Sequence, residues 1–258
     1  MKTLIKNLFK SKSIPPLLTG LADQHRIYCI GDIHGRVDLL YQLHKLIIAD
    51  SDNYHGTKTL VYLGDYIDRG SESKQVLDCL LDETQLTSFK KVYLLGNHEQ
   101  VLLQFLYTDD AHIANDWFKF GGLATLMSYG VELRGIPTLK DLARIRTELH
   151  NKIPKQHLDF YKNLSFYYEA GDYFFVHAGI KPKLKLDKQR PEDLLWIRDE
   201  FITSQLFHGK IIVHGHTVSP EPELLSNRIG IDTGAYSSGK LTCAVLENLN
   251  CNFIQTSQ

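Results

Sequence analysis

Five short segments of the chain carry side chains that bind divalent metals in proteins, and each directly follows an apolar run. In chain order they are Gly31-Asp32-Ile33-His34-Gly35, Gly64-Asp65-Tyr66-Ile67-Asp68-Arg69-Gly70, Gly96-Asn97-His98-Glu99, His177-Ala178-Gly179 and His214-Gly215-His216. They supply carboxylate oxygens, an amide oxygen and imidazole nitrogens, but no thiolate. Such a mixed set suits manganese, iron or zinc better than calcium. We therefore predict a site for two divalent metal ions.

The spacing of these residues also suggests how two ions share the ligands. Asp32 and His34 lie in one loop, so both can reach one ion, and the two carboxylate oxygens of Asp65 can bridge this ion to the second. The candidate ligands are Asp32, His34, Asp65, Asn97, His177 and His216. Two metals ~4 Å apart lower the pKa of a shared water toward ~7. The expected chemistry is in-line attack of a metal-bridging hydroxide on phosphorus.

The segments that position these residues alternate between strand-like and helix-like patterns. Short apolar runs predict strands at 26–30, 59–63 and 92–95, and helical spacing of apolar residues predicts helices at 37–49, 71–81 and 101–107. Strands that alternate with helices indicate right-handed crossovers and a largely parallel sheet, with ligands in the loops beyond the carboxyl ends of the strands. Glycine precedes Asp32, Asp65 and Asn97, where it permits a tight turn and a close approach.

The second half of the chain has a different pattern. Mixed helical periodicity over about 109–164 predicts a helical cap inserted into the α/β unit. Beyond it we expect a hairpin over 164–176 and strands at 210–213, 228–231 and 241–246. The predicted fold class is α/β, with two mixed β-sheets packed as a sandwich and flanked by helices. Because the candidate site runs from Asp32 to His216, we predict one domain over 23–258 after an N-terminal tail at 1–22.

The composition limits the partners of the protein. The 258 residues carry 29 basic and 30 acidic side chains, a net charge of -1, which leaves no basic footprint for nucleic acid. The four cysteines lie far apart, which indicates reduced thiols and a cytoplasmic protein. No run approaches the ~20 apolar residues of a membrane span. The basic segment 1–12 is interpreted as a solvated tail, so we expect no stable membrane association.

Taken together, the motifs resemble those of the metallophosphoesterase superfamily, and segments 64–70 and 96–99 are similar to its phosphoprotein phosphatase branch. The resemblance covers about residues 26–247. Segments 194–198 and 231–235 resemble stretches of the bacterial members, which include the lambda phage phosphatase. The resemblance implies the calcineurin-like fold and a binuclear metal centre, with manganese as the first choice and iron or zinc as alternatives.

The same resemblance implies a role for each residue of the site. It places Asp32, His34 and Asp65 on the first metal, and Asp65, Asn97, His177 and His216 on the second. His98 matches the general acid and Asp68 its orienting partner, while Arg69 and Arg198 match the arginines that bind phosphate. Tyr236 either lines the site or packs as an aromatic residue. His214 is interpreted as a strand-end histidine rather than a ligand.

The expected function is a serine/threonine protein phosphatase that hydrolyses phosphomonoesters, with a phosphoprotein or a small phosphorylated molecule as its substrate. His177-Ala178-Gly179 departs from the His-Gly-Gly of many family phosphatases and also resembles symmetrical bis(5'-nucleosyl)-tetraphosphatases, which are the alternative. A dinucleotide needs stacking surfaces, for which Trp117, Phe118 and Tyr129 are candidates beside a packing role. The complete ligand set disfavours a third hypothesis, an inactive phosphate-binding scaffold.

Overall fold

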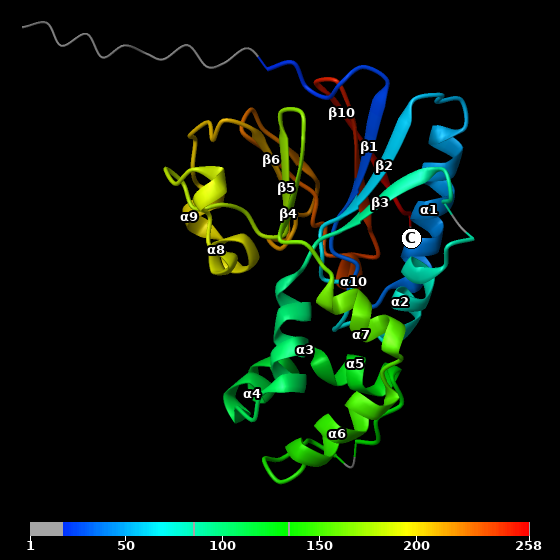
Figure 1. Ribbon diagram of the computed structural model, residues 1–258, viewed down its shortest axis with the longest axis vertical. Helices are drawn as coiled ribbons and strands as arrows, with labels where there is room; N and C mark the ends of the chain where they lie inside the picture. Colours follow the sequence, from blue (N-terminus) through cyan, green and yellow to red (C-terminus); the bar gives the residue numbers. More distant parts are fainter. Residues whose placement is uncertain (1–17, 85, 134, 258) are drawn as a thin grey trace, which may run out of the picture.

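Two mixed β-sheets face each other in the computed structural model, which describes residues 18–84, 86–133 and 135–257 (Figure 1). The first sheet has the order β10 (Asn250–Gln255), β9 (Thr242–Glu247), β1 (His25–Ile30), β2 (Thr57–Tyr62) and β3 (Phe89–Tyr93). The second has the order β4 (Tyr167–Ala170), β5 (Tyr173–Val176), β6 (Ile211–His214), β8 (Arg228–Gly230) and β7 (Glu223–Leu224). The predicted sandwich is confirmed, although β7 and β10 lie outside the predicted strands.

Three neighbouring strands of each sheet run parallel to one another, and the other two strands of each sheet pair antiparallel with their neighbours. β1 pairs in parallel with β2, and β2 with β3, as the alternation of strands and helices predicts. β9 runs antiparallel to β1, and β10 antiparallel to β9. In the second sheet, β6 is parallel to both β5 and β8. Loops after parallel strands emerge at a common edge, which is where the candidate ligands follow β1, β2, β3, β5 and β6.

Alternate side chains of the strands contribute to separate apolar clusters. In β1, Cys29 belongs to the cluster between the two sheets, and its neighbour Tyr28 belongs to the cluster on the outer face of the first sheet. Helices α1 (Val37–Ser51) and α2 (Ser73–Leu81) cover that outer face (Figure 1). Helices α8 (Pro191–Trp196) and α9 (Asp199–Ile202) cover the outer face of the second sheet, where Phe201 belongs to the same apolar cluster as Phe174 (Figure 1).

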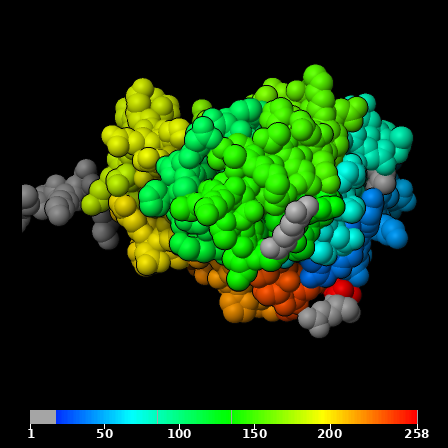
Figure 2. Space-filling model, turned by 90° about the horizontal axis from the view of Figure 1, so that it is seen from below, coloured from blue at the N-terminus to red at the C-terminus, as the bar shows by residue number. Residues whose placement is uncertain are grey.

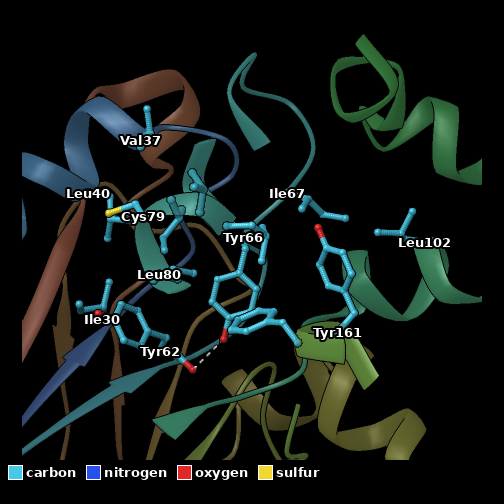
Figure 3. Packing of buried hydrophobic residues seen from close by; sticks show 14 of the residues in the cluster. Ile30, Val37, Leu40, Tyr62, Tyr66, Ile67, Cys79, Leu80, Leu102 and Tyr161 are labelled. Carbon is cyan, nitrogen blue, oxygen red and sulfur yellow. Dashed lines mark hydrogen bonds between the residues drawn. The ribbon is translucent and has the colours of Figure 1, made fainter. Parts of the chain in front are cut away.

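The loop after β2 is anchored in the outer cluster of the first sheet. Tyr66 and Ile67 are buried there, and Figure 3 shows Tyr66 beside Tyr62 and Tyr161 near Ile67. The Tyr66 hydroxyl donates a hydrogen bond to the carbonyl oxygen of Leu94 at 2.8 Å. Two buried apolar residues in the middle of this loop therefore fix the polar residues on either side of them.

Helix α3 (Asn97–Tyr107) begins four residues earlier than predicted. The expected loop at 96–100 is instead the first helical turn, so Asn97, His98 and Glu99 project from a helix end. The Glu99 carboxylate accepts the N–H of Gly96 at 3.1 Å, which satisfies a backbone donor that the first turn leaves without a partner. The prediction fails here because apolar periodicity starts only at Val101.

The described residues between α3 and β4, where the sequence predicts a cap, form four helices. They are α4 (Ala111–Lys119), α5 (Gly122–Ser128), α6 (Leu142–Lys152) and α7 (Lys155–Lys162). They gather at one end of the sandwich in Figure 1, and their surface, in green, faces the viewer in Figure 2. Trp117 and Leu126 are buried in the same apolar cluster as Leu102 of α3. The insert therefore shares its core with the first sheet.

The described chain begins with residues that are fixed to the sandwich. The Asp172 carboxylate accepts the N–H groups of Thr19 and Gly20 at 2.6 and 2.8 Å, and Leu21 is buried. The predicted solvated segment 1–12 lies outside the described residues. Of the helices that the structure describes, none combines the length and the apolar character needed to cross a membrane.

Candidate metal and phosphate site

Loops after β1, β2, β3, β6 and β8 line a cavity of about 280 Å³. Its lining residues are His34, Asp65, Arg69, His98, Arg198, His216, Thr217, Val218, Asp232 and Tyr236. Asp32, Asp68, Asn97 and His177 are buried and make hydrogen-bonding contacts with these residues. The fold thus brings together every residue that the sequence nominates for the site, from loops on both sheets.

The backbone of this site is unusual. His34, Asp65, Asp68, Arg69 and His216 adopt left-handed conformations with φ between 46° and 71°. Each such residue with a Cβ costs about 1–3 kcal/mol, which the surrounding structure must offset. One offset is visible between the first two loops, where the N–H groups of Ile33 and His34 both donate to the carbonyl of Asp65 at 3.1 and 2.8 Å.

Hydrogen-bond acceptors converge at the expected position of the second metal. The Nδ1–H of His177 donates to the carbonyl of Leu63 at 2.9 Å, so its Nε2 carries a lone pair. This Nε2 lies 2.8 Å from Asn97 Oδ1 and 3.4 Å from Asp65 Oδ1. The Nδ1 of His216 lies 3.2 Å from the same Nε2 and 3.0 Å from Asn97 Oδ1. Acceptors packed this closely repel one another unless a cation lies among them, so the donor set fits a divalent ion.

His34 shows the same pattern at the expected position of the first metal. Its Nδ1–H donates to the carbonyl of Ile67 at 2.8 Å, and its Nε2 lies 3.4 Å from Asp65 Oδ2. Burial lowers the pKa of His34 to about 3, so the ring is neutral, as a metal ligand must be. Among the residues that the structure describes, two groups have ligand atoms within 4.8 Å of one another: His34, Asp65 and His98, and Asp65, His177 and His216. Asp65 belongs to both groups, as a bridging ligand would.

Asp32 lies outside both groups but is fixed beside them. Its Oδ2 accepts the backbone N–H of His216 at 3.0 Å. Burial, together with the negative charges of Asp232 and Asp65, raises the pKa of Asp32 well above its ordinary value. Carboxylates that destabilise one another in this way need a positive countercharge. A divalent ion would supply it.

Asp232 is a further carboxylate of the cavity, and its role was not predicted. Its Oδ1 accepts the N–H of Gly234 at 2.9 Å, and burial raises its pKa to about 6. The available signal was its position directly after the apolar run Ile229-Gly230-Ile231, which matches the position of Asp32 after β1.

Glu99 also has no predicted role, yet it links the loops after β2 and β3. Its Oε2 accepts the N–H groups of Asp65 and Gly96 at 2.9 and 3.1 Å, and its Oε1 those of Tyr66 and Ile67 at 2.8 and 3.3 Å. The two loops touch, because a Cβ on Gly64 would lie 2.5 Å from the nitrogen of Gly96. Glycine before the ligand is therefore required for close approach.

His98 and Asp68 form a buried pair beside the cavity. The Nδ1–H of His98 donates to Asp68 Oδ2 at 2.7 Å, and its Nε2 lies 3.7 Å from Asp65 Oδ2. Burial opposes protonation of the ring, but the carboxylates of Asp65 and Asp68 outweigh it and raise the pKa of His98 to about 9. A protonated imidazole that lines a cavity can donate its proton to a leaving oxygen.

Two exposed arginines stand at the cavity. Arg69 Nη1 donates to the Tyr236 hydroxyl at 2.9 Å, and its guanidinium carbon lies 4.6 Å from the centroid of that ring. Arg198 Nη1 donates to the carbonyl of His216 at 2.9 Å. The planar guanidinium offers paired donors to phosphate oxygens. Tyr236 both lines the cavity and packs on Arg69, so it has both of the roles that the sequence suggested.

The prediction that Trp117, Phe118 and Tyr129 of the insert could stack on a nucleoside base is wrong. Trp117 and Tyr129 are buried, and Phe118 packs against Phe105 with ring centroids 6.0 Å apart. Other half-buried rings stand beside the site instead: Phe120 lies 6.0 Å from the ring of His98, and Trp196 lies 6.4 Å from that of His216.

His214 is the histidine of its motif that does not enter the site. Its ring packs against Phe201 with centroids 5.1 Å apart, and its Nδ1–H donates to the carbonyl of Gly215 at 3.1 Å. Burial lowers the pKa of His214 to about 4. A neutral, packed imidazole at the end of β6 agrees with the strand-end interpretation.

Comparison with known proteins places this geometry in a family. The family model described as calcineurin-like phosphoesterase matches residues 25–254. The asymmetrical bis(5'-nucleosyl)-tetraphosphatase PrpE of Oceanobacillus iheyensis is 28% identical over 84% of this chain and 87% of its own length. Serine/threonine-protein phosphatase 2 of Escherichia coli is also 28% identical, over 84% of this chain and 90% of its own.

A solved structure supports the fold. The crystal structure of a cold-active protein tyrosine phosphatase superposes with a TM-score of 0.56 at 20% identity, covering 92% of this chain and 81% of that protein. At this identity the likeness concerns the fold alone. The match of the family model over nearly the whole described chain, together with the converging ligand loops, shows that the protein belongs to the calcineurin-like metallophosphoesterases.

Proposed function

We propose that the protein hydrolyses phosphate monoesters of serine or threonine, using two divalent metal ions, with manganese as the first choice. The observation that carries this proposal is the His98–Asp68 pair, in which Asp68 Oδ2 accepts the Nδ1–H of His98 at 2.7 Å. A serine-derived alkoxide is a strongly basic leaving group, so its departure depends on a proton donor. When a phosphoanhydride is hydrolysed, the leaving group is a phosphate anion, which needs that proton donor less.

Each residue then has a defined task. Bound divalent ions would be held by Asp32, His34, Asp65, Asn97, His177 and His216, and would supply an ionised nucleophile and charge neutralisation. Arg69 and Arg198, which line the cavity, donate hydrogen bonds to the phosphoryl oxygens. His98 gives a proton to the leaving oxygen, and Asp68 keeps the imidazole charged and oriented.

An asymmetrical dinucleoside tetraphosphatase is the second candidate. The half-buried rings of Phe120, Trp196 and Tyr236 stand beside the imidazoles of the site and offer stacking surfaces to a nucleoside base. The PrpE relative is named for asymmetrical cleavage. This name revises the symmetrical hydrolase that the His177-Ala178-Gly179 segment suggested.

We further propose that the protein works in a reducing compartment such as the cytoplasm. All four cysteines are free thiols, and Cys29, Cys79 and Cys243 are buried. Burial raises the pKa of each of these thiols, so they remain protonated and unreactive. Buried thiols of this kind persist where no oxidant forces their pairing.

Parallel kinetics on three substrates test the function. The manganese-loaded protein is assayed against a phosphoserine peptide, diadenosine tetraphosphate and an aryl phosphate. We expect kcat/KM to be highest for the phosphopeptide. Hydrolysis confined to diadenosine tetraphosphate would refute this and favour the second candidate. Its products then decide the cleavage mode, because asymmetrical attack gives a nucleoside monophosphate and a nucleoside triphosphate, and symmetrical attack gives two nucleoside diphosphates.

A further inference from the structure

The Asp68 carboxylate has more partners than His98 alone. Thr125 Oγ1–H donates to Asp68 Oδ1 at 2.6 Å. The indole Nε1–H of Trp117 lies 3.2 Å from Oδ1 and 3.0 Å from Oδ2. Together with His98, three donors from three helices surround a side chain that is 0% exposed. Two of these donors come from the helical insert.

Thr125 also holds the backbone of Asp68. Its hydroxyl oxygen accepts the N–H of Asp68 at 2.9 Å, while its proton goes to the carboxylate. Ser73 Oγ lies 3.0 Å from the same hydroxyl and accepts the Asp68 N–H at 3.1 Å. Asp68 has a left-handed backbone with φ 71°, so these contacts help to impose a conformation that the residue would otherwise avoid.

The Gly121-Gly122 pair explains how the insert reaches this position. The carbonyl of Gly121 accepts the N–H of Arg69 at 3.3 Å, which joins the turn between α4 and α5 to the loop after β2. Gly122 lies under the indole of Trp117, where a Cβ would come within 2.5 Å of Trp117 Cδ2. Because Gly122 has no side chain, the indole of Trp117 can pack against this turn and place its N–H beside the Asp68 carboxylate.

We propose that Trp117 and Thr125 are positioning residues for the general acid, so that the helical insert completes the catalytic machinery of the sheet loops. Both donors fix the plane of the Asp68 carboxylate, which in turn fixes the imidazole of His98. This inference rests on the proposed function, because a general acid matters only when the leaving oxygen is basic. A tryptophan that merely filled the core would affect all substrates alike.

Conservative variants separate the two roles. Trp117→Phe keeps an aromatic ring and removes the N–H, and Thr125→Val keeps the shape and removes the hydroxyl. The matched control is Tyr129→Phe, which removes a buried hydroxyl of the insert that contacts His157 Nδ1 at 2.8 Å and Tyr161 at 3.1 Å. Each variant is assayed for kcat on a phosphoserine peptide and on 4-nitrophenyl phosphate. The ratio of the two rates cancels any loss of folded protein.

We expect kcat on the phosphoserine peptide to fall about tenfold in Trp117→Phe and in Thr125→Val, with aryl phosphate hydrolysis reduced by about threefold or less. Tyr129→Phe should leave the ratio unchanged. On a His98→Asn background, Thr125→Val should cost nothing further, because residues that act as one unit are not additive. Equal losses on both substrates, or the same change in ratio for Tyr129→Phe, would overturn the proposal.

A spectroscopic measurement keeps this inference separate from the proposed function. If the wild-type protein hydrolyses neither monoester, the proposed function fails, and the contact is then judged by NMR. The Trp117 indole N–H resonance, assigned by its loss in Trp117→Phe, should shift in Asp68→Asn, and the His98 Nδ1–H resonance should shift in Thr125→Val. Resonances that stay unchanged in both variants would show that the insert does not hold Asp68.

Discussion

Replacing Glu99 by Gln tests whether one buried carboxylate holds the two central loops together. Glu99 is 0% exposed, and each of its oxygens accepts two backbone N–H groups. Both oxygens accept N–H groups, which favours the ionised carboxylate, whereas burial and the charge of Asp65 oppose it and raise the pKa of Glu99 to about 8. Glutamine has the same shape but turns one oxygen into an NH₂ group, which cannot accept.

The size of the effect follows from these bonds. Two of the four N–H groups would face a donor, and hydrogen bonds to a charged group contribute about 1.5–3 kcal/mol each. We therefore expect Glu99→Gln to lose about 3–6 kcal/mol of stability. For a protein of this size that is a fall in Tm of roughly 6–24 °C. Manganese affinity should also fall, because the N–H of Asp65 is among the bonds lost.

Calorimetry of the metal-free protein gives Tm, and titration calorimetry gives the manganese Kd. Glu247→Gln is the matched control: this residue pairs with Arg26 at 2.6 Å and its side chain is 37% exposed. Exposed pairs contribute about 0–1 kcal/mol, so its Tm should hardly change. If Glu99→Gln kept both the Tm and the manganese Kd of the wild type, the carboxylate would not hold the loops by its charge.

Three further predictions concern other parts of the molecule. Asp65→Asn should lower the bound manganese measured by elemental analysis below two ions, because Asp65 stands in both ligand groups; full activity of exhaustively chelated wild-type protein would contradict the two-metal site. Arg69→Ala and Arg198→Ala should weaken competitive inhibition by inorganic phosphate about tenfold while metal content stays normal, and a collapse of metal content would show that they are not phosphate ligands. Burial lowers the pKa of His44 from 6.5 to about 4. His44 therefore becomes protonated below about pH 6.5 in the unfolded chain but only below about pH 4 in the folded chain. The free energy of unfolding should therefore fall by about 2–3 kcal/mol between pH 7 and pH 4.5. Urea unfolding of His44→Gln should lack this part of the decline. Parallel stability profiles of the wild type and His44→Gln over this pH range would contradict the prediction.

The arrangement of the first half of the fold was predictable from local pattern. Apolar runs and helical periodicity place β1, β2, α1 and α2 within a few residues of their observed bounds. Parallel strands end at one edge of a sheet, so polar residues directly after them had to meet. Because these strand ends meet, the Asp, Asn and His residues that follow them could be predicted as metal ligands. The start of α3 was missed because its first turn is polar and is capped by Glu99.

The sequence alone determined which residue types stand at the strand ends, because that follows from local order along the chain. Tertiary structure decided how they are held. The Asp65 N–H donates to Glu99 and the Thr125 hydroxyl donates to Asp68 across 34 and 57 positions of the chain, and no local pattern marks Glu99 or Thr125 as such a partner. Left-handed backbone at Asp65 and Asp68 is likewise imposed by neighbours that pack only in the folded state. The buried role of Trp117 depends on which face of α4 meets the loop after β2, and that choice is made by packing between elements distant in sequence.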